Sequence, residues 1–207
     1  GRLCFSTGNS ILEYTDVNQP WDRTGGSFWQ CKANIIAGSV FVPRGLASPV
    51  EYLCIFTTAG LQILAGGTFA EPPMHYAGII PPGNHQCVVQ TQQWLMWLNR
   101  NQGIQGCNLA GVIDVGRRFL NGDGETGPLD TFSITNAQQA TKTFGFYDEK
   151  KREAIWMFPD GTNTVNSHAV VLDLSLGGPM TGEAPIESGP FPSFEDRVRC
   201  FYWSIYD

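Results

Sequence analysis

Short apolar segments separated by polar, glycine-containing turns recur along this chain. Residues 53–64 (LCIFTTAGLQIL) and 94–105 (WLMWLNRNQGIQ) each predict an apolar strand, a polar turn ending in glycine, and a second strand that opens on an apolar residue. The pattern returns roughly every 45 residues, which is the length of one β-propeller blade. We therefore expect an all-β fold: a β-propeller-like array of four-stranded antiparallel blades, either incomplete or closed by other segments.

The strand patterns group into four units and a partial fifth. We expect the units at approximately residues 1–26, 35–67, 87–118 and 141–176, with a partial strand unit at 195–207, all within a single domain over residues 1–207. Residues 68–83, rich in proline and glycine, predict a connection. Four units and a fragment make a small or incomplete ring, so its missing strands would come from another chain or from a longer protein. Expected strands lie at residues 2–6, 11–15, 35–42, 50–56, 61–64, 87–90, 93–98, 103–107, 143–147, 153–159, 169–174 and 197–206.

Helical periodicity is weak throughout the sequence, and residues 136–142 (NAQQATK) are the best helical candidate. No apolar run approaches the roughly 20 residues that a membrane span requires, and no signal peptide pattern is visible. The chain begins Gly1-Arg2-Leu3 without methionine. We interpret it as a processed or trimmed piece of a longer protein.

Composition agrees with a turn-rich β fold that meets other proteins. The 207 residues include 24 glycines and 13 prolines, and charged residues make up only 15%, against about 25% in average soluble domains. A surface with so little charge suggests extensive protein contacts. The formal net charge of −6 argues against tight binding of nucleic acid, which depends on contacts between basic side chains and phosphates.

The six cysteines show no C-x-x-C spacing, so the common zinc sites are not expected. Buried thiols are the favoured interpretation, although disulfides stay open as an alternative. The residues concerned are Cys4, Cys31, Cys54, Cys87, Cys107 and Cys200.

Candidate catalytic and metal-binding residues do not assemble into a motif. His75, His85 and His168 lack a second ligand at a metal-binding spacing, and no nucleophile elbow, P-loop or dinucleotide fingerprint occurs. Asp123 and Glu125 lie in a glycine-rich loop that lacks the further oxygen ligands of a calcium loop. We therefore expect no catalytic, cofactor-binding or metal-binding residues, and no cofactor. For a propeller glycosidase, the available side chains would be Asp16, Asp114, Asp148 and Asp173, with Arg44, Arg100 and Arg117.

Two further groups of side chains each have two interpretations. Trp21, Phe28, Trp29 and Tyr76 are candidates for stacking on sugars from exposed loops, or for hydrophobic filling between blades or subunits. Asp148 is expected to begin a turn by accepting backbone N–H bonds. Lys150, Lys151 and Arg152 fall at the tip of that turn, either solvated or in contact with an acidic partner or DNA.

Residues 146–159 (FYDEKKREAIWMFP) and 166–174 (NSHAVVLDL), together with residues 14–22 (YTDVNQPWD), resemble the β-propeller region of tail proteins of tailed bacteriophages. The family comprises nozzle, tail-tubular and tail-hub proteins. The resemblance covers about two thirds of the chain, and members of the family are usually much longer than its 207 residues.

The resemblance implies a structural virion protein of the phage tail, made in the host cytoplasm. Its partners would be other tail proteins and copies of itself in a ring, six-fold in the nozzle proteins, that conducts double-stranded DNA during ejection without membrane insertion. An acidic lumen would repel phosphates and let the duplex slide. The alternatives are a propeller that binds carbohydrate or a receptor at a tail tip or cell surface and, less favoured, a glycoside hydrolase.

Overall fold

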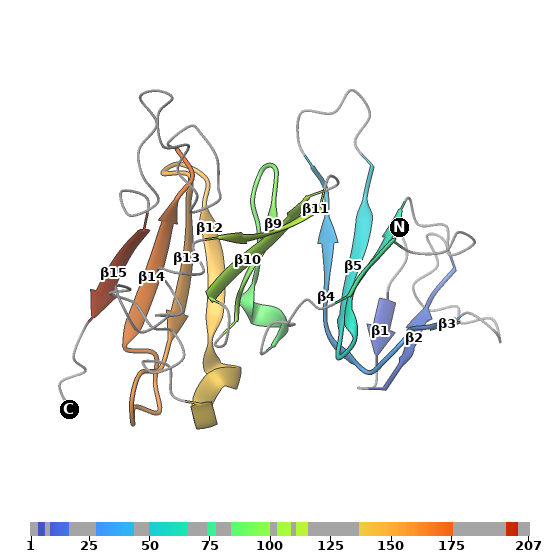
Figure 1. Cartoon of the computed structure of the whole chain (residues 1–207), viewed down its shortest axis with the longest axis horizontal. Helices are drawn as coiled ribbons and strands as arrows, with labels where there is room; N and C mark the ends of the chain where they lie inside the picture. Colours follow the sequence, from blue (N-terminus) through green and yellow to red (C-terminus); the bar gives the residue numbers. More distant parts are fainter. Residues whose placement is uncertain are drawn as a thin grey trace. The chain divides into compact units, whose positions relative to one another are not determined.

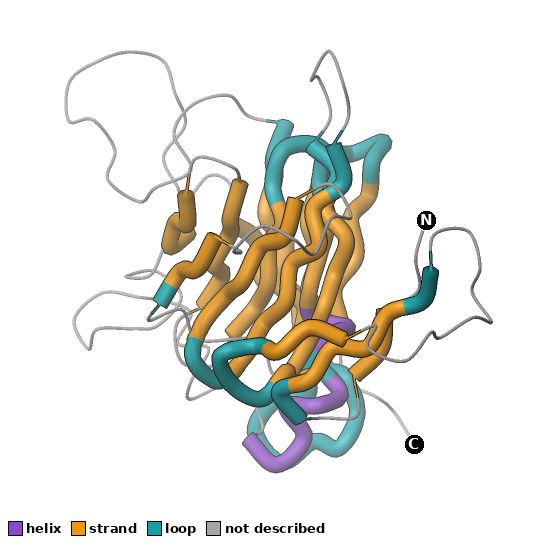
Figure 2. Tube along the Cα trace, turned by 90° about the vertical axis from the view of Figure 1, so that its right-hand side faces the viewer, coloured by secondary structure: helices purple, strands orange, loops and turns teal. Residues whose placement is uncertain are grey.

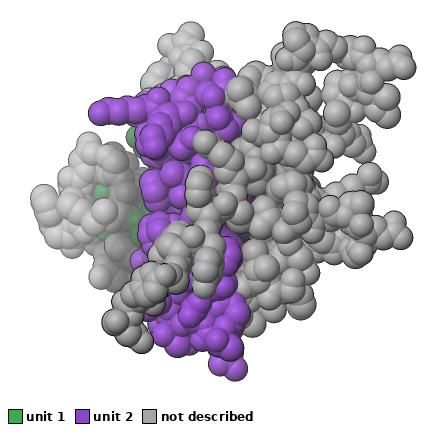
Figure 3. Space-filling view, turned by 90° about the vertical axis from the view of Figure 1, so that its left-hand side faces the viewer, with its two compact units in different colours: residues 1–81 green, residues 82–207 purple. Residues whose placement is uncertain are grey.

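The described part of the chain folds into strands and turns that form four antiparallel sheets (Figure 1). The computed structural model describes residues 4–6, 9–16, 28–43, 50–65, 74–77, 84–99, 103–108, 111–115, 137–175 and 198–202. Among them the helical elements are two 3₁₀ segments, drawn in purple in Figure 2. The all-β prediction is confirmed. The chain divides into two compact units, residues 1–81 and 82–207 (Figure 3), and each is described by itself.

The first unit contains two antiparallel meanders. The first sheet has the strand order β1-β2-β3 and the second sheet the order β4-β5-β6-β7. Every strand pairs with its neighbour in the sequence, as expected where short connections join antiparallel strands. Their bounds are β1 Cys4–Ser6, β2 Ile11–Tyr14, β3 Phe28–Gln30, β4 Ile35–Phe41, β5 Tyr52–Thr57, β6 Gly60–Ala65 and β7 Met74–Tyr76.

The two sheets of the first unit pack through one face each. Leu12 and Trp29 are cross-strand partners in the first sheet, and they share a hydrophobic cluster with Ile55 and Leu64 of the second sheet. Because successive side chains alternate across a strand, the neighbours of Leu12 and Trp29 point the other way. We call that opposite side the outer face of the first sheet; its described side chains are Ile11, Glu13, Phe28 and Gln30.

The turn between β5 and β6 shows why its sequence ends in glycine. Gly60 has a φ of +127°, and an added Cβ would lie 2.2 Å from the carbonyl oxygen of Tyr76 on β7. The hydroxyl of Thr57 accepts the N–H of Ala59 and donates to the carbonyl of Gly60. A glycine at this position therefore satisfies both the backbone conformation and the close approach of β7.

The second unit repeats the meander twice. The third sheet has the order β11-β10-β9-β8 and the fourth the order β12-β13-β14-β15. Two 3₁₀ segments, η1 His85–Cys87 and η2 Ala137–Lys142, precede their first strands. The strands are β8 Val88–Gln90, β9 Leu95–Asn99, β10 Gly103–Asn108, β11 Gly111–Val115, β12 Phe144–Asp148, β13 Glu153–Phe158, β14 His168–Asp173 and β15 Val198–Tyr202.

One hydrophobic cluster joins the third and fourth sheets. The third sheet contributes Val89, Met96, Leu98 and Ile104, and the fourth contributes Ala154, Trp156, Phe158, Val170 and Leu172. All nine side chains are buried, so this is the core of the second unit. β12, the first strand of the fourth sheet, lies beside β8, the first strand of the third. We call the opposite side of the fourth sheet its outer face; its described side chains include Phe144, Phe146, Ile155, Met157, Ala169 and Val171.

The indole of Trp156 fastens the two sheets of this unit together. Its Nε1 donates to the backbone oxygen of Cys87, 2.9 Å away and buried. To reach that oxygen the ring crosses β12 at Gly145, where an added Cβ would lie 2.6 Å from the Cδ1 of Trp156 and 2.5 Å from the Cγ2 of Val89. Only a residue without a side chain leaves room for this crossing.

Polar contacts around η1 reinforce the same junction. The Oδ1 of Asn84 accepts the N–H groups of Gln86 and Cys87, while its Nδ2 donates to the carbonyl oxygens of Thr141 and Thr143. The thiol of Cys87 also donates to the Thr143 oxygen. These bonds tie the start of the third sheet to the segment that leads into the fourth.

The paired strands extend beyond the predicted units. β3 pairs with β2 past residue 26, and β7 pairs with β6 inside the predicted connection 68–83. β15 pairs with β14, so it completes the fourth sheet instead of opening a fifth unit. In each case a short strand pairs with the edge of a sheet across a connection, which local periodicity does not reveal.

The helical prediction for residues 136–142 is confirmed in part, as the 3₁₀ segment η2. The single domain over 1–207 stays a prediction.

The prediction that the cysteines are buried is confirmed for four of them. Cys31, Cys54, Cys87 and Cys107 are buried thiols outside any disulfide. It is wrong for Cys4, which is exposed on β1, because an edge strand has neighbours on one side only. The side chain of Cys200 lies outside the described residues.

We expect Gly145→Ala to lower the free energy of unfolding by about 1–3 kcal/mol, because its methyl group overpacks the crossing of Trp156. Urea denaturation measures this change. Gly106→Ala on β10 is the matched control, since its added Cβ would make ordinary contacts of 3.5 Å with Met96. Equal effects of the two substitutions would contradict the assigned role of Gly145.

Alkylation of the folded protein at neutral pH should modify Cys4 well before Cys31. Burial raises the pKa of the Cys31 thiol to about 11, so this buried group holds almost no reactive thiolate. Peptide mapping by mass spectrometry separates the two sites, and urea-unfolded protein is the control in which both react. Equal labelling in the folded protein would contradict the burial of Cys31.

Candidate functional site

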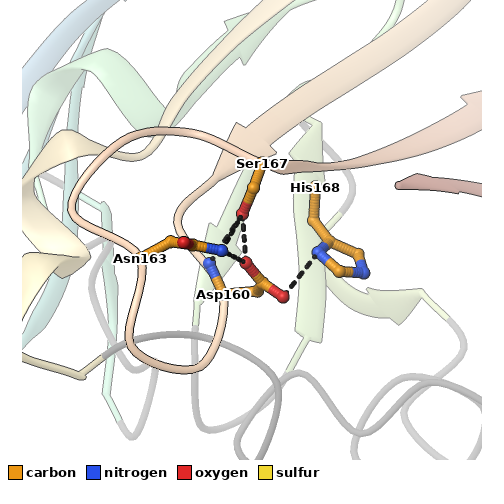
Figure 4. A network of polar contacts seen from close by, with 4 residues as sticks. All are labelled: Asp160, Asn163, Ser167 and His168. Carbon is orange, nitrogen blue, oxygen red and sulfur yellow. Dashed lines mark hydrogen bonds and ion pairs between the residues drawn. The ribbon is translucent and has the colours of Figure 1, made fainter. Parts of the chain in front are cut away.

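The most developed polar cluster among the described residues lies in the loop between β13 and β14 (Figure 4). Asp160 is its centre: one carboxylate oxygen accepts hydrogen bonds from the Ser167 hydroxyl and the Asn163 amide. The other carboxylate oxygen lies 3.2 Å from Nδ1 of His168. The ring of His168 stacks on Phe158, with 5.8 Å between centroids. We call these four polar residues the Asp160 clasp.

The electrostatics of the clasp favour a charged carboxylate. Burial by itself raises the pKa of the Asp160 carboxyl, but hydrogen bonds from Ser167 and Asn163 and the nearby His168 outweigh it. The net result is a pKa below the ordinary value for aspartate. The ionised form is therefore the one that the folded loop stabilises.

The contacts of the clasp hold the loop between β13 and β14 in one conformation. In a nucleophilic triad the serine hydroxyl is activated by the imidazole, whereas here the Ser167 hydroxyl donates to the carboxylate. Further bonds attach the same loop to the end of η2: Lys142 Nζ donates to the Thr164 carbonyl, and Asn166 Nδ2 donates to the Lys142 carbonyl. The arrangement orders the loop at this end of the fourth sheet.

Two of the candidate carboxylates accept local hydrogen bonds at a turn and at a strand end. Asp148 accepts the backbone N–H groups of Lys150 and Lys151, which confirms its predicted role in the turn. Asp173 accepts the backbone N–H and hydroxyl of Ser175 at the end of β14. Asp16 is half-buried after β2. The side chain of Asp114 and the whole of Arg44, Arg100, Arg117, Asp123 and Glu125 lie outside the described residues.

The histidines are dispersed within the described part of the chain, which contains no group of three or more His, Cys, Asp or Glu side chains able to hold a metal ion. His85 is exposed in η1. Nδ1 of His75 on β7 lies 3.3 Å from the ammonium group of Lys32. Only His168 joins a polar cluster, through Asp160.

Three of the four candidate aromatic residues occupy strands, so the prediction that they lie in loops is wrong for these three. Phe28 and Trp29 lie on β3 and Tyr76 on β7, while Trp21 lies outside the described residues. Trp29 packs against the core of the first unit, but Phe28 is 56% exposed. Trp97 and Trp156 are fully buried, so neither offers an exposed stacking surface.

An exposed apolar surface on the fourth sheet is the second candidate functional feature. On the outer face of the fourth sheet, Phe146 is 44% exposed and stacks on Phe144, with 6.3 Å between ring centroids. The exposure is concentrated on the β12 side of that face, since Ala169 and Val171 on β14 are buried. Contiguous apolar patches mark interaction surfaces, and Phe146 is the exposed large hydrophobic side chain described on this face.

Sequence reasoning missed both the clasp and this face. The clasp brings Asp160 to Ser167 and His168 across a loop, a spacing that matches no motif. The face was detectable in principle, because Phe144 and Phe146, like Ile155 and Met157, place apolar side chains on the side opposite to Trp156. Two apolar faces on one strand pair indicate that both sides of the sheet are to be covered.

Comparisons with known proteins identify no relative: no protein-family model, no curated protein and no solved structure matches the chain. Among the described residues, no helix has the length and apolar character needed to span a membrane.

We expect Asp160→Asn to lower the free energy of unfolding at pH 7 by about 1–2 kcal/mol, the scale of charged hydrogen bonds. Because folding lowers the pKa of Asp160, the stabilisation is present above the unfolded pKa of about 3.9 and is lost as the pH falls through the folded value. The difference between wild type and variant should therefore shrink toward pH 3 in urea titrations.

Asp173→Asn is the matched control for this experiment, since it neutralises a carboxylate at the end of the same strand pair outside the clasp. An Asp160→Asn difference that stays constant from pH 7 to pH 3 would contradict the ionised clasp.

Proposed function

We propose that this chain is a structural component of a bacteriophage tail: a β-propeller-like module that assembles with copies of itself in a ring through which DNA passes. One observation carries the proposal: in each unit, four-stranded or three-stranded meanders pack face to face through apolar side chains. Face-to-face meanders with adjacent first strands, such as β8 and β12, are the packing expected between propeller blades.

The surface chemistry supports assembly. On the outer face of the fourth sheet, Phe146 is 44% exposed and stacks on the half-buried Phe144, and covering such an apolar side chain by another surface is favourable. The low content of charged residues, 15%, favours extensive protein contacts. The net charge of −6 is compatible with a lumen along which a DNA duplex slides without being trapped.

Carbohydrate or receptor binding is a second candidate, favoured by the exposure of Phe28, because an exposed ring can stack on a sugar. Binding on a glycan array that is lost in Phe28→Ala would support it. A hydrolase has less support, because Asp148 and Asp173 accept local hydrogen bonds at turns and strand ends.

We expect the purified chain to assemble into a closed oligomer, with a native mass several times the 22.8 kDa of one chain. Analytical ultracentrifugation and native mass spectrometry measure this mass, and electron microscopy of the tail would locate the ring. A monomer at all concentrations up to the micromolar range would contradict the ring, and glycan binding by that monomer would favour the second candidate.

A further inference from the structure

We propose that the second sheet has an edge that opens in acid: protonation of His75 releases the strand β7 from β6. This inference goes beyond the proposed function and does not depend on it. It begins from the position of β7, a three-residue strand at the edge of its sheet, which pairs with β6 along Leu61–Ile63. Short edge elements belong to the parts of a protein that open locally at low free energy, so a single side chain can decide whether β7 stays paired.

The imidazole of His75 contacts a cation through one of its two nitrogens. Nδ1 lies 3.3 Å from Nζ of Lys32, in the segment between β3 and β4. An ammonium group has donors and no acceptor, so Nδ1 accepts the hydrogen bond, and the neutral ring carries its proton on Nε2. The contact therefore ties β7 to the segment that follows β3 only while the imidazole is uncharged.

The second nitrogen of this ring offers no better place for a positive charge. Nε2 of His75 is buried and has no hydrogen-bond partner among the described residues. Protonation would spread charge over a ring that has an ammonium group beside Nδ1 and no acceptor at Nε2. Like charges this close repel each other, and a buried charge without a partner is strongly unfavourable. Uptake of a proton is therefore coupled to departure of the ring.

Within the described part of the chain, no carboxylate contacts the ring to offset such a charge. The cross-strand partner of His75 is Gln62, which is buried and accepts the backbone N–H of Lys32 through Oε1. On the first sheet, Glu13 lies on the outer face, turned away from the second sheet. The thiol of Cys31 is neutral, because burial raises its pKa to about 11.

The other two histidines lack this combination. Nδ1 of His168 lies 3.2 Å from the carboxylate of Asp160, so a proton on that ring meets an anion. His85 is exposed in η1, where water solvates a charge. Free imidazole titrates at about pH 6.5. The pairing of β7 is therefore complete above that range and weakens below it, whereas the loop between β13 and β14 keeps its contacts there.

Release of β7 would leave the backbone groups of β6 along Leu61–Ile63 unpaired on that side. Unpaired N–H and C=O groups on a sheet edge are a template for pairing with another strand. The second sheet thus has an edge that is closed at neutral pH and open in acid.

Hydrogen exchange followed by mass spectrometry, corrected for the intrinsic pH dependence of exchange, tests the proposal on the whole chain. We expect exchange in the peptide that contains β7 to rise about tenfold from pH 8 to pH 5.5, because one proton taken up on release changes the opening equilibrium about tenfold per pH unit. His75→Gln should abolish the rise, since an amide accepts a hydrogen bond from Lys32 without titrating. His85→Gln is the matched control and should keep the rise.

Reversal of the neighbouring charge provides a second test. Lys32→Glu should remove the rise, because a carboxylate beside the ring favours the imidazolium. His75→Phe, which keeps a ring that does not titrate, replaces His75→Gln if that variant does not fold. Urea midpoints at each pH and exchange in the β13–β14 loop distinguish release of β7 from global unfolding.

Three results would overturn the proposal. The first is exchange of the β7 peptide that is equally fast at both pH values in the wild-type chain. The second is a rise that persists in His75→Gln or Lys32→Glu. The third is an equal rise in the β13–β14 loop, which would show that acid unfolds the chain as a whole.

Discussion

The second unit depends on one buried hydrogen bond between two sheets. Trp156 stands on β13, yet its indole N–H reaches the carbonyl of Cys87 at the start of the third sheet, 2.9 Å away. A buried indole N–H without an acceptor would cost about 1–3 kcal/mol, so this acceptor decides how far apart the two sheets can lie. Gly145 makes the bond feasible, because any side chain there would occupy the path of the ring. Asn84 and Cys87 then hold the same junction through Thr141 and Thr143.

This constraint explains why the fourth sheet has two faces of different character. The side that meets Cys87 is closed by the tryptophan and its apolar neighbours, and water is excluded from it. The other side of β12 carries the stacked rings of Phe144, which is half-buried, and Phe146, which is 44% exposed. The Asp160 clasp holds the loop that follows β13 by fixed polar contacts. The second unit thus combines an ordered loop with a partly exposed apolar sheet face, which is consistent with the assembly proposed above.

Much of the strand arrangement was predictable from particular residues. The turn at residues 57–60 and the hairpin around Asp148 follow from glycine with positive φ and from a carboxylate that accepts backbone N–H bonds. β3 and β7 were missed and β15 was assigned to a separate unit, because each is a short strand that pairs across a connection. The clasp could not be predicted, since Asp160 meets His168 only when the loop between them closes.

By itself, the sequence determined the class of fold and the local strand–turn–strand units, because these depend on the period of apolar residues and on the chemistry of turn residues a few positions apart. The tertiary structure alone decided which face of each strand pair is buried within a unit. That choice depends on contacts between distant residues, such as Trp156 with Cys87 and Leu12 with Leu64. Both faces of the β12–β13 hairpin are apolar in sequence, and only packing against the third sheet distinguishes the closed face from the partly exposed one.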